Sequence, residues 1–388
     1  MPNFCLINDI SQLIDVNRLG DDEYLKSMKL KKYTKGSNEP EKHFIVRYTD
    51  KTDRVARLFR SCVFYDGKLV SYSPQKSVSY EELYGDVYYV EEFVEGTMVN
   101  VYYLNDIWCL STRSVLNAGG SFYEKETTFK TMFIDCMSKL GLEYEYLNPK
   151  YSYSFLIQHP KNRIVKRIYS PTLYLCAVYE IMDGKIVNEL DIYTEAQRIQ
   201  SLLPHNKNIL RTPVYYGCGS RDFAEQYKNS DCYPNKLTYD MMGIVIKDRS
   251  GNRYKWRNPM YEYVRKLRGN QPKLQYQYLV LRNTGKVSDY LKYYPEHRPL
   301  FSRFREIIHS FTGHLYENYV KCFIKHEKPL EQFPYEYRSH MIAIHEFYIK
   351  KYRKDKKSIT FKDVVEYINK LEPPRLMYSL NYNLHQPR

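Results

Sequence analysis

The chain has 388 residues, enough for about two domains that each bury a sizeable hydrophobic core. Its 59 Lys and Arg residues outnumber its 45 Asp and Glu residues, and the formal net charge of +14 favours a polyanionic partner such as nucleic acid. Charge alone leaves open a basic globular protein that binds no polyanion. No run of eighteen apolar residues occurs, which excludes a membrane-spanning helix, and we expect no membrane partner.

The spacing of the eight cysteines gives no sign of a structural metal site. No two of them form a Cys-x-x-Cys pair, so a zinc ribbon is not indicated and we expect no bound metal. Several lie in apolar, strand-like runs typical of buried thiols in a reducing compartment. The first eighteen residues lack the pattern of a signal peptide. These features predict a cytoplasmic protein.

Short apolar runs separated by turns predict β-structure in the first two thirds of the chain. Residues 1–40 are expected to form an N-terminal extension with some helix. Asp66-Gly67 lies between two alternating runs and predicts a hairpin. Another hairpin is predicted over 241–257. Helices are predicted over 122–140 and 194–203, and further strands over 153–159, 163–169, 173–181 and 185–193.

After Pro259 the apolar positions repeat every three or four residues, which is typical of helices. Helices are predicted over 261–268, 287–294, 300–326, 335–354 and 360–371. The expected fold is therefore α+β, with a domain of strands and helices over 41–260 and an all-helical C-terminal domain over 261–388. The helical domain offers a surface for a protein partner.

Several blocks spaced along the sheet domain form a recognisable series. They are Arg60-Ser61-Cys62-Val63-Phe64, Phe93-Val94-Glu95-Gly96-Thr97, Thr112-Arg113-Ser114, Ser154 to Val165, Met241 to Val245, and Tyr254-Lys255-Trp256-Arg257. Together they resemble the RNA ligase branch of the covalent nucleotidyltransferases, and most closely the T4 RNA ligase 1 type. The resemblance covers roughly Arg60 to Tyr261. Similar open reading frames occur in giant DNA viruses.

The resemblance implies an antiparallel-sheet nucleotidyltransferase fold whose catalytic groups are missing. In such ligases a lysine attacks the α-phosphate of ATP or GTP, and Phe93 stands at that position. A phenyl ring cannot attack phosphorus or leave from a phosphoramidate. The active-site glutamates of the family fall at Leu156 and Met242, so we expect no catalytic residue at these positions. Because Mg²⁺ prefers oxygen ligands, including carboxylates, its anchors are also lost.

The residues expected to contact phosphate are largely retained. The resemblance implies nucleotide or RNA-phosphate contacts for Arg60, Glu95, Gly96, Arg113, Lys255 and Arg257. The following segment, from Lys247 to Arg305, is rich in Lys and Arg with interleaved Tyr and Trp, a composition used to bind single-stranded RNA. Its densest part suggests RNA contacts by Arg265, Lys266, Arg268 and Lys273. The alternative is a solvated linker with its aromatic residues in the core.

Three classes of function follow. The leading hypothesis is a non-enzymatic, catalytically degenerate RNA-ligase-like protein that binds RNA, such as a 5′ end or cap, with no cofactor. The second is an active RNA ligase or nucleotidyltransferase with a displaced nucleophile, for which Lys76 is a candidate; this enzyme would need ATP or GTP with Mg²⁺. The third is a viral assembly protein that uses the fold as a scaffold. A viral protein would be expected in the infected host cell or virus factory.

Overall fold

The computed structural model describes residues 7–83, 87–121, 127–204, 209–217, 238–248, 251–354 and 357–384. The chain divides into two compact units, Met1–Tyr263 and Val264–Arg388, which are described separately. In the described part of the chain, no helix is both long and apolar enough to cross a membrane.

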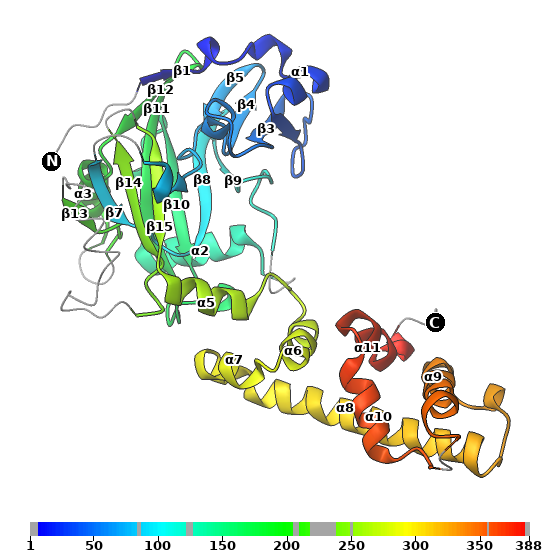
Figure 1. Ribbon diagram of the computed structural model, residues 1–388. Helices are drawn as coiled ribbons and strands as arrows, with labels where there is room; N and C mark the ends of the chain where they lie inside the picture. Colours follow the sequence, from blue (N-terminus) through cyan, green and yellow to red (C-terminus); the bar gives the residue numbers. More distant parts are fainter. Residues whose placement is uncertain are drawn as a thin grey trace. The chain divides into compact units, whose positions relative to one another are not determined.

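The described residues of the first unit contain a six-stranded antiparallel sheet (Figure 1). Its strand order is β1-β12-β11-β10-β8-β9. The strands span Ile7–Asp9 (β1), Thr97–Leu104 (β8), Ile107–Ser111 (β9), Tyr151–Gln158 (β10), Thr172–Met182 (β11) and Ile186–Leu190 (β12).

Two smaller sheets complete the β-structure of the described residues. One has the order β13-β7-β14-β15-β6 and is antiparallel except between β15 and β6; the other is the meander β2-β3-β4-β5. The first comprises Val78–Ser79 (β6), Val87–Glu92 (β7), Tyr215–Gly217 (β13), Gly243–Asp248 (β14) and Arg253–Arg257 (β15). The second comprises Leu30–Tyr33 (β2), His43–Tyr48 (β3), Cys62–Tyr65 (β4) and Lys68–Ser71 (β5).

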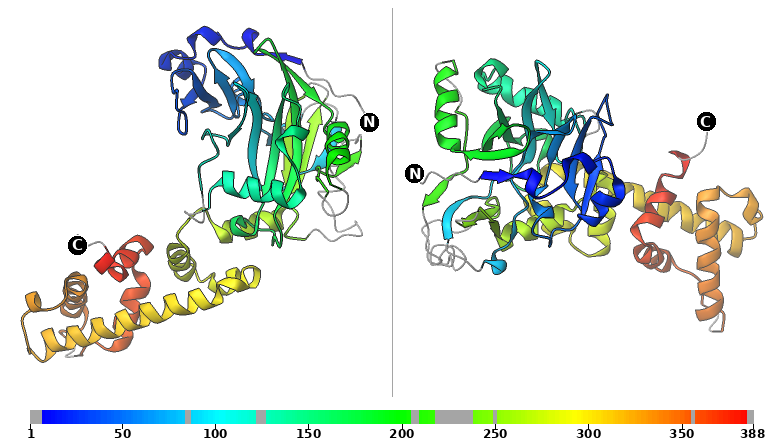
Figure 2. Two further views of the ribbon diagram at one scale, coloured as in Figure 1. Left: turned by 180° about the vertical axis from the view of Figure 1, so that it is seen from behind. Right: turned by 90° about the horizontal axis from the view of Figure 1, so that it is seen from above.

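Two helices bury one face of the six-stranded sheet (Figure 2). They are α2 (Phe129–Leu140) and α3 (Ile192–Leu202), and their apolar sides share one core cluster with β8, β10 and β11. Phe133 of α2 is fully buried there and packs on Phe155 of β10, with ring centroids 5.8 Å apart. This core fixes the opposite face of the sheet, which carries the candidate site.

The N-terminal residues belong to the first unit's core. Ile10, Leu19 and Leu25, the last in α1 (Asp22–Ser27), are buried against the meander and against β11 and β12. The region expected as an extension is therefore packed into the unit, because its apolar side chains cover sheet residues that would otherwise face water.

Both expected hairpins are confirmed, as β4–β5 and as β14–β15. The expected helix over 122–140 begins later, at Phe129, because the Thr128 side chain caps it by accepting a hydrogen bond from the Thr131 amide. Residues 122–126 lie outside the described part. The strand expected over 163–169 is wrong: this segment is irregular. Two of its amides donate to the Glu95 carboxylate instead of to a neighbouring strand.

The second unit is helical in its described residues. Its long helix α8 (Arg298–Tyr319) packs against most of the other helices, and a short π-helical turn, Val320–Ile324, follows it. The remaining α-helices described in this unit are α6 (Leu274–Asn283), α7 (Val287–Tyr293), α9 (Tyr335–Lys351), α10 (Phe361–Lys370) and α11 (Pro373–Leu380). Helix α5 (Pro259–Arg268) contains the sequence boundary between the two units. Helices α6 and α11 were not expected from the sequence.

Aromatic and histidine side chains hold these helices together. Tyr290 stacks on Tyr294 and Phe301, with ring centroids 4.6 and 5.1 Å apart. His340 is buried and its ring nitrogens lie 2.8 Å from the Tyr367 hydroxyl and 2.7 Å from the Ser379 hydroxyl. Burial and nearby Arg375 lower the pKa of His340 to about 4, so the ring is neutral and joins α9, α10 and α11.

Replacing Phe133 with Ala should lower the free energy of unfolding of the first unit by about 3–5 kcal/mol, because a fully buried ring is removed and a cavity remains. The neighbouring Ile134 is 46% exposed, and Ile134→Ala should change it by less than about 1 kcal/mol. Both tryptophans, Trp108 and Trp256, lie in this unit, so urea unfolding followed by tryptophan fluorescence reports on it. Equal effects of the two substitutions would contradict this core assignment.

Candidate functional site

Most of the predicted site residues line one cavity of about 250 Å³ between the six-stranded and five-stranded sheets. The cavity is bounded by β8, β10 and β11 on one side and by β7, β14 and β15 on the other. Its lining residues are Arg60, Lys76, Ser77, Glu91, Glu92, Phe93, Val94, Gly96, Met98, Arg113, Leu156, Cys176, Pro213, Met242, Val245, Arg253, Lys255 and Arg257. Blocks that are distant in sequence thus meet at one place.

Strand β15 supplies three of the cations by simple alternation. Successive side chains of a strand point to opposite faces, so Arg253, Lys255 and Arg257 share the cavity face. Tyr254 and Trp256 point the other way and are buried, at 7% and 8% exposure. These two aromatic residues therefore belong to the core, and the basic face of β15 is formed by the alternate positions.

Arg60 enters the cavity from the segment before β4, and its guanidinium has no hydrogen bond or ion pair among the described residues. Burial, together with nearby Arg253 and Arg113, lowers its pKa to about 10, so it remains charged at neutral pH. Arg113 follows β9 and is exposed at the cavity rim. Cations that lie close together in a half-buried cavity repel one another, which makes this cavity a favourable place for an anion.

Lys76 is the cation that the motif comparison did not assign. It precedes β6 and lines the cavity together with Lys255, whose Nζ donates to the carbonyl of Ser77, the residue after Lys76, at 2.9 Å. Burial and the charges of Lys255, Arg60 and Arg257 lower the pKa of Lys76 to about 7. Burial also lowers the pKa of Lys255. Part of the Lys76 population therefore carries an unprotonated amine at neutral pH.

The two carboxylates of the cavity are already engaged. Glu91 is 2% exposed and forms an ion pair of 3.3 Å with Arg253. Glu92 accepts a hydrogen bond from the Val214 amide at 3.3 Å. One Glu91 oxygen and the Nε atoms of Arg253 and Arg257 are buried without a hydrogen-bond partner. The cavity keeps unsatisfied polar atoms along its basic side.

Apolar side chains occupy the positions where the resemblance implies catalytic groups. Phe93 lies beneath the Arg257 guanidinium, whose carbon is 5.5 Å from the ring centroid. Leu156 of β10 is 7% exposed and packs with Val94 and Tyr174. Met242 lines the cavity just before β14. These residues leave an open space between them rather than filling it.

Gly96 is required by close packing. A side chain here would place its Cβ 2.5 Å from the Ile157 carbonyl oxygen and in contact with the Leu156 side chain, and its φ is 154°. Only glycine fits this approach between β7 and β8. Gly96 therefore lets β10 lie close to the cavity.

Glu95 was expected to contact phosphate, but it is 5% exposed and does not line the cavity. Its carboxylate accepts hydrogen bonds from the Val165 and Lys166 amides at 3.1–3.3 Å. Burial raises its pKa, against the opposing effect of hydrogen bonds from Tyr261 and these amides. Glu95 thus anchors the irregular segment after Asn162.

The other predicted RNA contacts lie in the second unit. Lys266 and Lys273 are exposed, Arg265 is half-buried and Arg268 is buried at 8% exposure. Of the aromatic residues expected nearby, Tyr261 and Tyr278 are buried, and Tyr263 is 39% exposed. Most of the aromatic residues expected to stack on RNA therefore lie in the core, whereas Lys266 and Lys273 are accessible to a polyanion.

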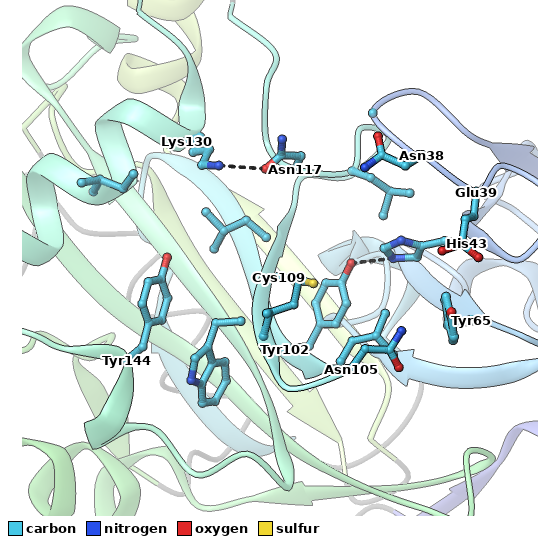
Figure 3. A pocket seen from close by; sticks show the side chains of 17 residues that line it. Asn38, Glu39, His43, Tyr65, Tyr102, Asn105, Cys109, Asn117, Lys130 and Tyr144 are labelled. Atoms are coloured by element: carbon cyan, nitrogen blue, oxygen red, sulfur yellow. Dashed lines mark hydrogen bonds between the residues drawn. The ribbon is translucent and has the colours of Figure 1, made fainter.

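A larger cavity of about 540 Å³ lies elsewhere in the first unit (Figure 3). His43 and Tyr102 face each other there, with the His43 Nε2 and Tyr102 hydroxyl 2.9 Å apart. Lys130 donates to Asn117 at 3.1 Å. None of the residues singled out by the sequence motifs lines it, and its charged groups are few, so it does not share the basic character of the first cavity.

Replacing Glu95 with Ala should leave two buried amides without an acceptor and lower the free energy of unfolding by about 1–3 kcal/mol. It should also let trypsin cleave after Lys166 and Arg167, because the segment loses its anchor. Glu95→Gln keeps one acceptor oxygen and should have a smaller effect on both. Urea unfolding and limited proteolysis measure these effects; wild-type stability and wild-type cleavage for Glu95→Ala would contradict the anchoring role.

No protein-family model matches the chain. In sequence it is similar to the "Immediate-early protein ICP-46 homolog" of Invertebrate iridescent virus 3, with 22% identity over 235 residues, or 58% of this chain. The match spans 48% of that protein, so the chain covers about half the length of this curated relative.

Similar solved structures are ATP-dependent ligases. An archaeal ATP-dependent RNA ligase has a TM-score of 0.43 at 12% identity, covering 75% of this chain and 78% of that one. A putative ATP-dependent DNA ligase from Aquifex aeolicus has a TM-score of 0.38 at 14% identity, with coverages of 80% and 78%. A Naegleria gruberi RNA ligase with PPi has a TM-score of 0.35 at 15% identity, with coverages of 50% and 57%.

At these TM-scores no residue role follows from the likenesses, and the functional argument rests on the cavity itself. The expected α+β class is confirmed, with antiparallel sheets followed by a helical region. The chain is thus similar to ATP-dependent DNA and RNA ligases among solved structures and to an iridescent-virus protein in sequence.

Proposed function

We propose that the first unit is a ligase-like fold that binds the 5′ end of an RNA through its basic cavity and does not transfer a nucleotide. The observation that carries the proposal is the composition of the cavity. Its cations are Arg60, Lys76, Arg113, Arg253, Lys255 and Arg257, and its carboxylates are Glu91 and Glu92. Cationic groups bind phosphate without any catalytic group.

A resident divalent metal does not fit the residues of this cavity. Mg²⁺ takes oxygen ligands, and Leu156 and Met242 supply none. Glu91 is paired with Arg253, and Glu92 accepts a backbone amide. Elsewhere in the described part of the chain, no group of three or more His, Cys, Asp or Glu side chains is placed to hold a metal. The proposed binding therefore uses the cations alone.

The size of the cavity favours phosphate groups over a whole enclosed nucleotide. Pockets that enclose small ligands usually measure about 300–1,000 Å³, and this one measures about 250 Å³. A 5′ end can place its terminal phosphates inside while the remaining RNA lies outside. The net charge of +14 and exposed Lys266 and Lys273 favour a polyanion over a neutral ligand.

A second candidate function is supported by Lys76. Nucleophilic lysines need a lowered pKa, and Lys76 lines the cavity beside Phe93 with a pKa of about 7. In this reading Lys76 replaces the missing lysine and the chain uses ATP or GTP with a divalent metal. The poor fit of a metal makes this the weaker candidate.

Similarity to an iridovirus protein supports a viral setting. We propose that the protein acts in the host cytoplasm and that its helical unit is the surface for a protein partner.

The RNA proposal predicts a preference for 5′-phosphorylated RNA over the same oligonucleotide with a 5′-hydroxyl, measured by fluorescence anisotropy at fixed salt. Lys255→Glu should weaken binding of the phosphorylated RNA by about tenfold or more and abolish the preference, because a charge-assisted contact is lost. Lys150 is exposed and does not line this cavity, so Lys150→Glu is a control with the same change in net charge.

Lys150→Glu should keep the preference for the phosphorylated end. Equal affinity of the wild-type protein for both RNAs would contradict the proposal. So would a Lys255→Glu variant that behaves like Lys150→Glu, because binding would then follow net charge alone.

A further inference from the structure

We propose that Lys76 and Lys255 form a proton-accepting pair that binds a terminal phosphomonoester dianion without a divalent metal. The inference rests on the proposed function and narrows its ligand to an RNA 5′ end that carries a free monophosphate. A capped end is disfavoured, because every phosphate of a cap is esterified or in an anhydride and none is a terminal monoester.

The two lysines lie in one crowded group of cations. Both line the cavity, and the Lys255 Nζ donates to the carbonyl of Ser77, the residue after Lys76, at 2.9 Å. Like charges close together disfavour the protonated form of an amine. The neutral amine is therefore assigned to Lys76 when no anion is bound.

The surroundings of the pair explain why the second proton is absent. The charged groups that face it are Arg60, Arg113, Arg253, Arg257, Glu91 and Glu92, and Lys51 acts on Lys255 from further away. Cys176 of β11 is a neutral thiol, because burial raises its pKa to about 12. The cations outnumber the carboxylates, even though Glu91 pairs with Arg253 and Glu262 pairs with Arg257. A second ammonium would add to an uncompensated positive charge.

A bound dianion reverses this balance. The neutral Lys76 amine takes one proton from solvent, and the two ammonium groups then donate to the phosphate oxygens. Two positive charges match the two negative charges of the monoester, so the pair supplies the charge that a divalent metal would otherwise supply. The lowered pKa of Lys76, about 7, agrees with this cycle.

Proton uptake gives the pair a measurable signature. Above pH 7 the free protein must gain one proton on binding, so the affinity should fall by about tenfold per pH unit between pH 7.5 and 9. The probe is adenosine 5′-monophosphate, whose phosphate stays a dianion over this range because a phosphomonoester has its second pKa near about 6. Adenosine is the control without a phosphate. Calorimetry in EDTA, in two buffers of different ionisation enthalpy, gives the affinity and the protons taken up.

Two substitutions of Lys76 distinguish the effect of its positive charge on affinity from the effect of proton uptake. Lys76→Arg keeps a permanent cation and should bind the monophosphate with an affinity that no longer depends on pH in this range, with no proton uptake. Lys76→Met keeps the apolar stem and should bind it at least about tenfold more weakly, because a charge-assisted contact is lost. Unfolding followed by tryptophan fluorescence confirms that each variant is folded before it is titrated.

Metal-independent binding with uptake of one proton supports the pair. Binding that requires Mg²⁺, an affinity that is constant from pH 7.5 to 9, or no saturable binding of the monophosphate would each overturn it. A Lys76→Met variant with the wild-type pH dependence would also overturn it. Proton-linked binding of the monophosphate by a protein that fails to prefer 5′-phosphorylated RNA would support the pair and overturn RNA as the ligand.

Discussion

The excess of positive charge around one cavity is the constraint on which the site depends. Placing half-buried cations close together is costly, and the described carboxylates at this cavity are too few to neutralise its arginines and lysines. Two of the cations have carboxylate partners, Arg253 with Glu91 and Arg257 with Glu262, and the pKa values of Arg60 and Lys76 are lowered. An anionic ligand would neutralise the positive charge that remains in the cavity. The proposed metal-free binding agrees with Leu156 and Met242, which stand where the sequence resemblance implies carboxylates.

The fold creates this arrangement with ordinary strand geometry. Pairing of β14 with β7 and β15 places Val245 between Glu91 and Lys255. The alternation of β15 directs its charged residues into the cavity and its aromatic residues into the core. On the other side, Gly96 permits the close approach of β10, and α2 and α3 hold the sheet from behind. The site is therefore built on strands supported by a packed core, which keeps the cations in fixed positions.

The sequence was informative where local patterns decide the structure. Turn residues such as Asp66-Gly67 and helical periodicity after Pro259 predicted elements that the structure contains. The spaced motifs assigned phosphate contacts to Arg60, Glu95, Gly96, Arg113, Lys255 and Arg257, and all of these except Glu95 line one cavity. Contacts between distant segments were harder to predict. The 163–169 segment has strand-like composition, yet the Glu95 carboxylate accepts hydrogen bonds from two of its amides. Lys76 was named from the sequence only as a candidate displaced nucleophile. Its place with Lys255 in one cavity depends on the pairing of β6 with β15, which no spacing rule shows.

The intact mass of the protein after incubation with ATP or GTP and Mg²⁺ or Mn²⁺ tests the central claim most directly. If the cavity grips phosphate without transferring a nucleotide, the mass will equal that of the unmodified chain, beside a ligase control that forms its adduct. A nucleoside monophosphate attached to the chain would contradict the account. Peptide mapping of the adduct to Lys76 would then identify this residue as a displaced nucleophile.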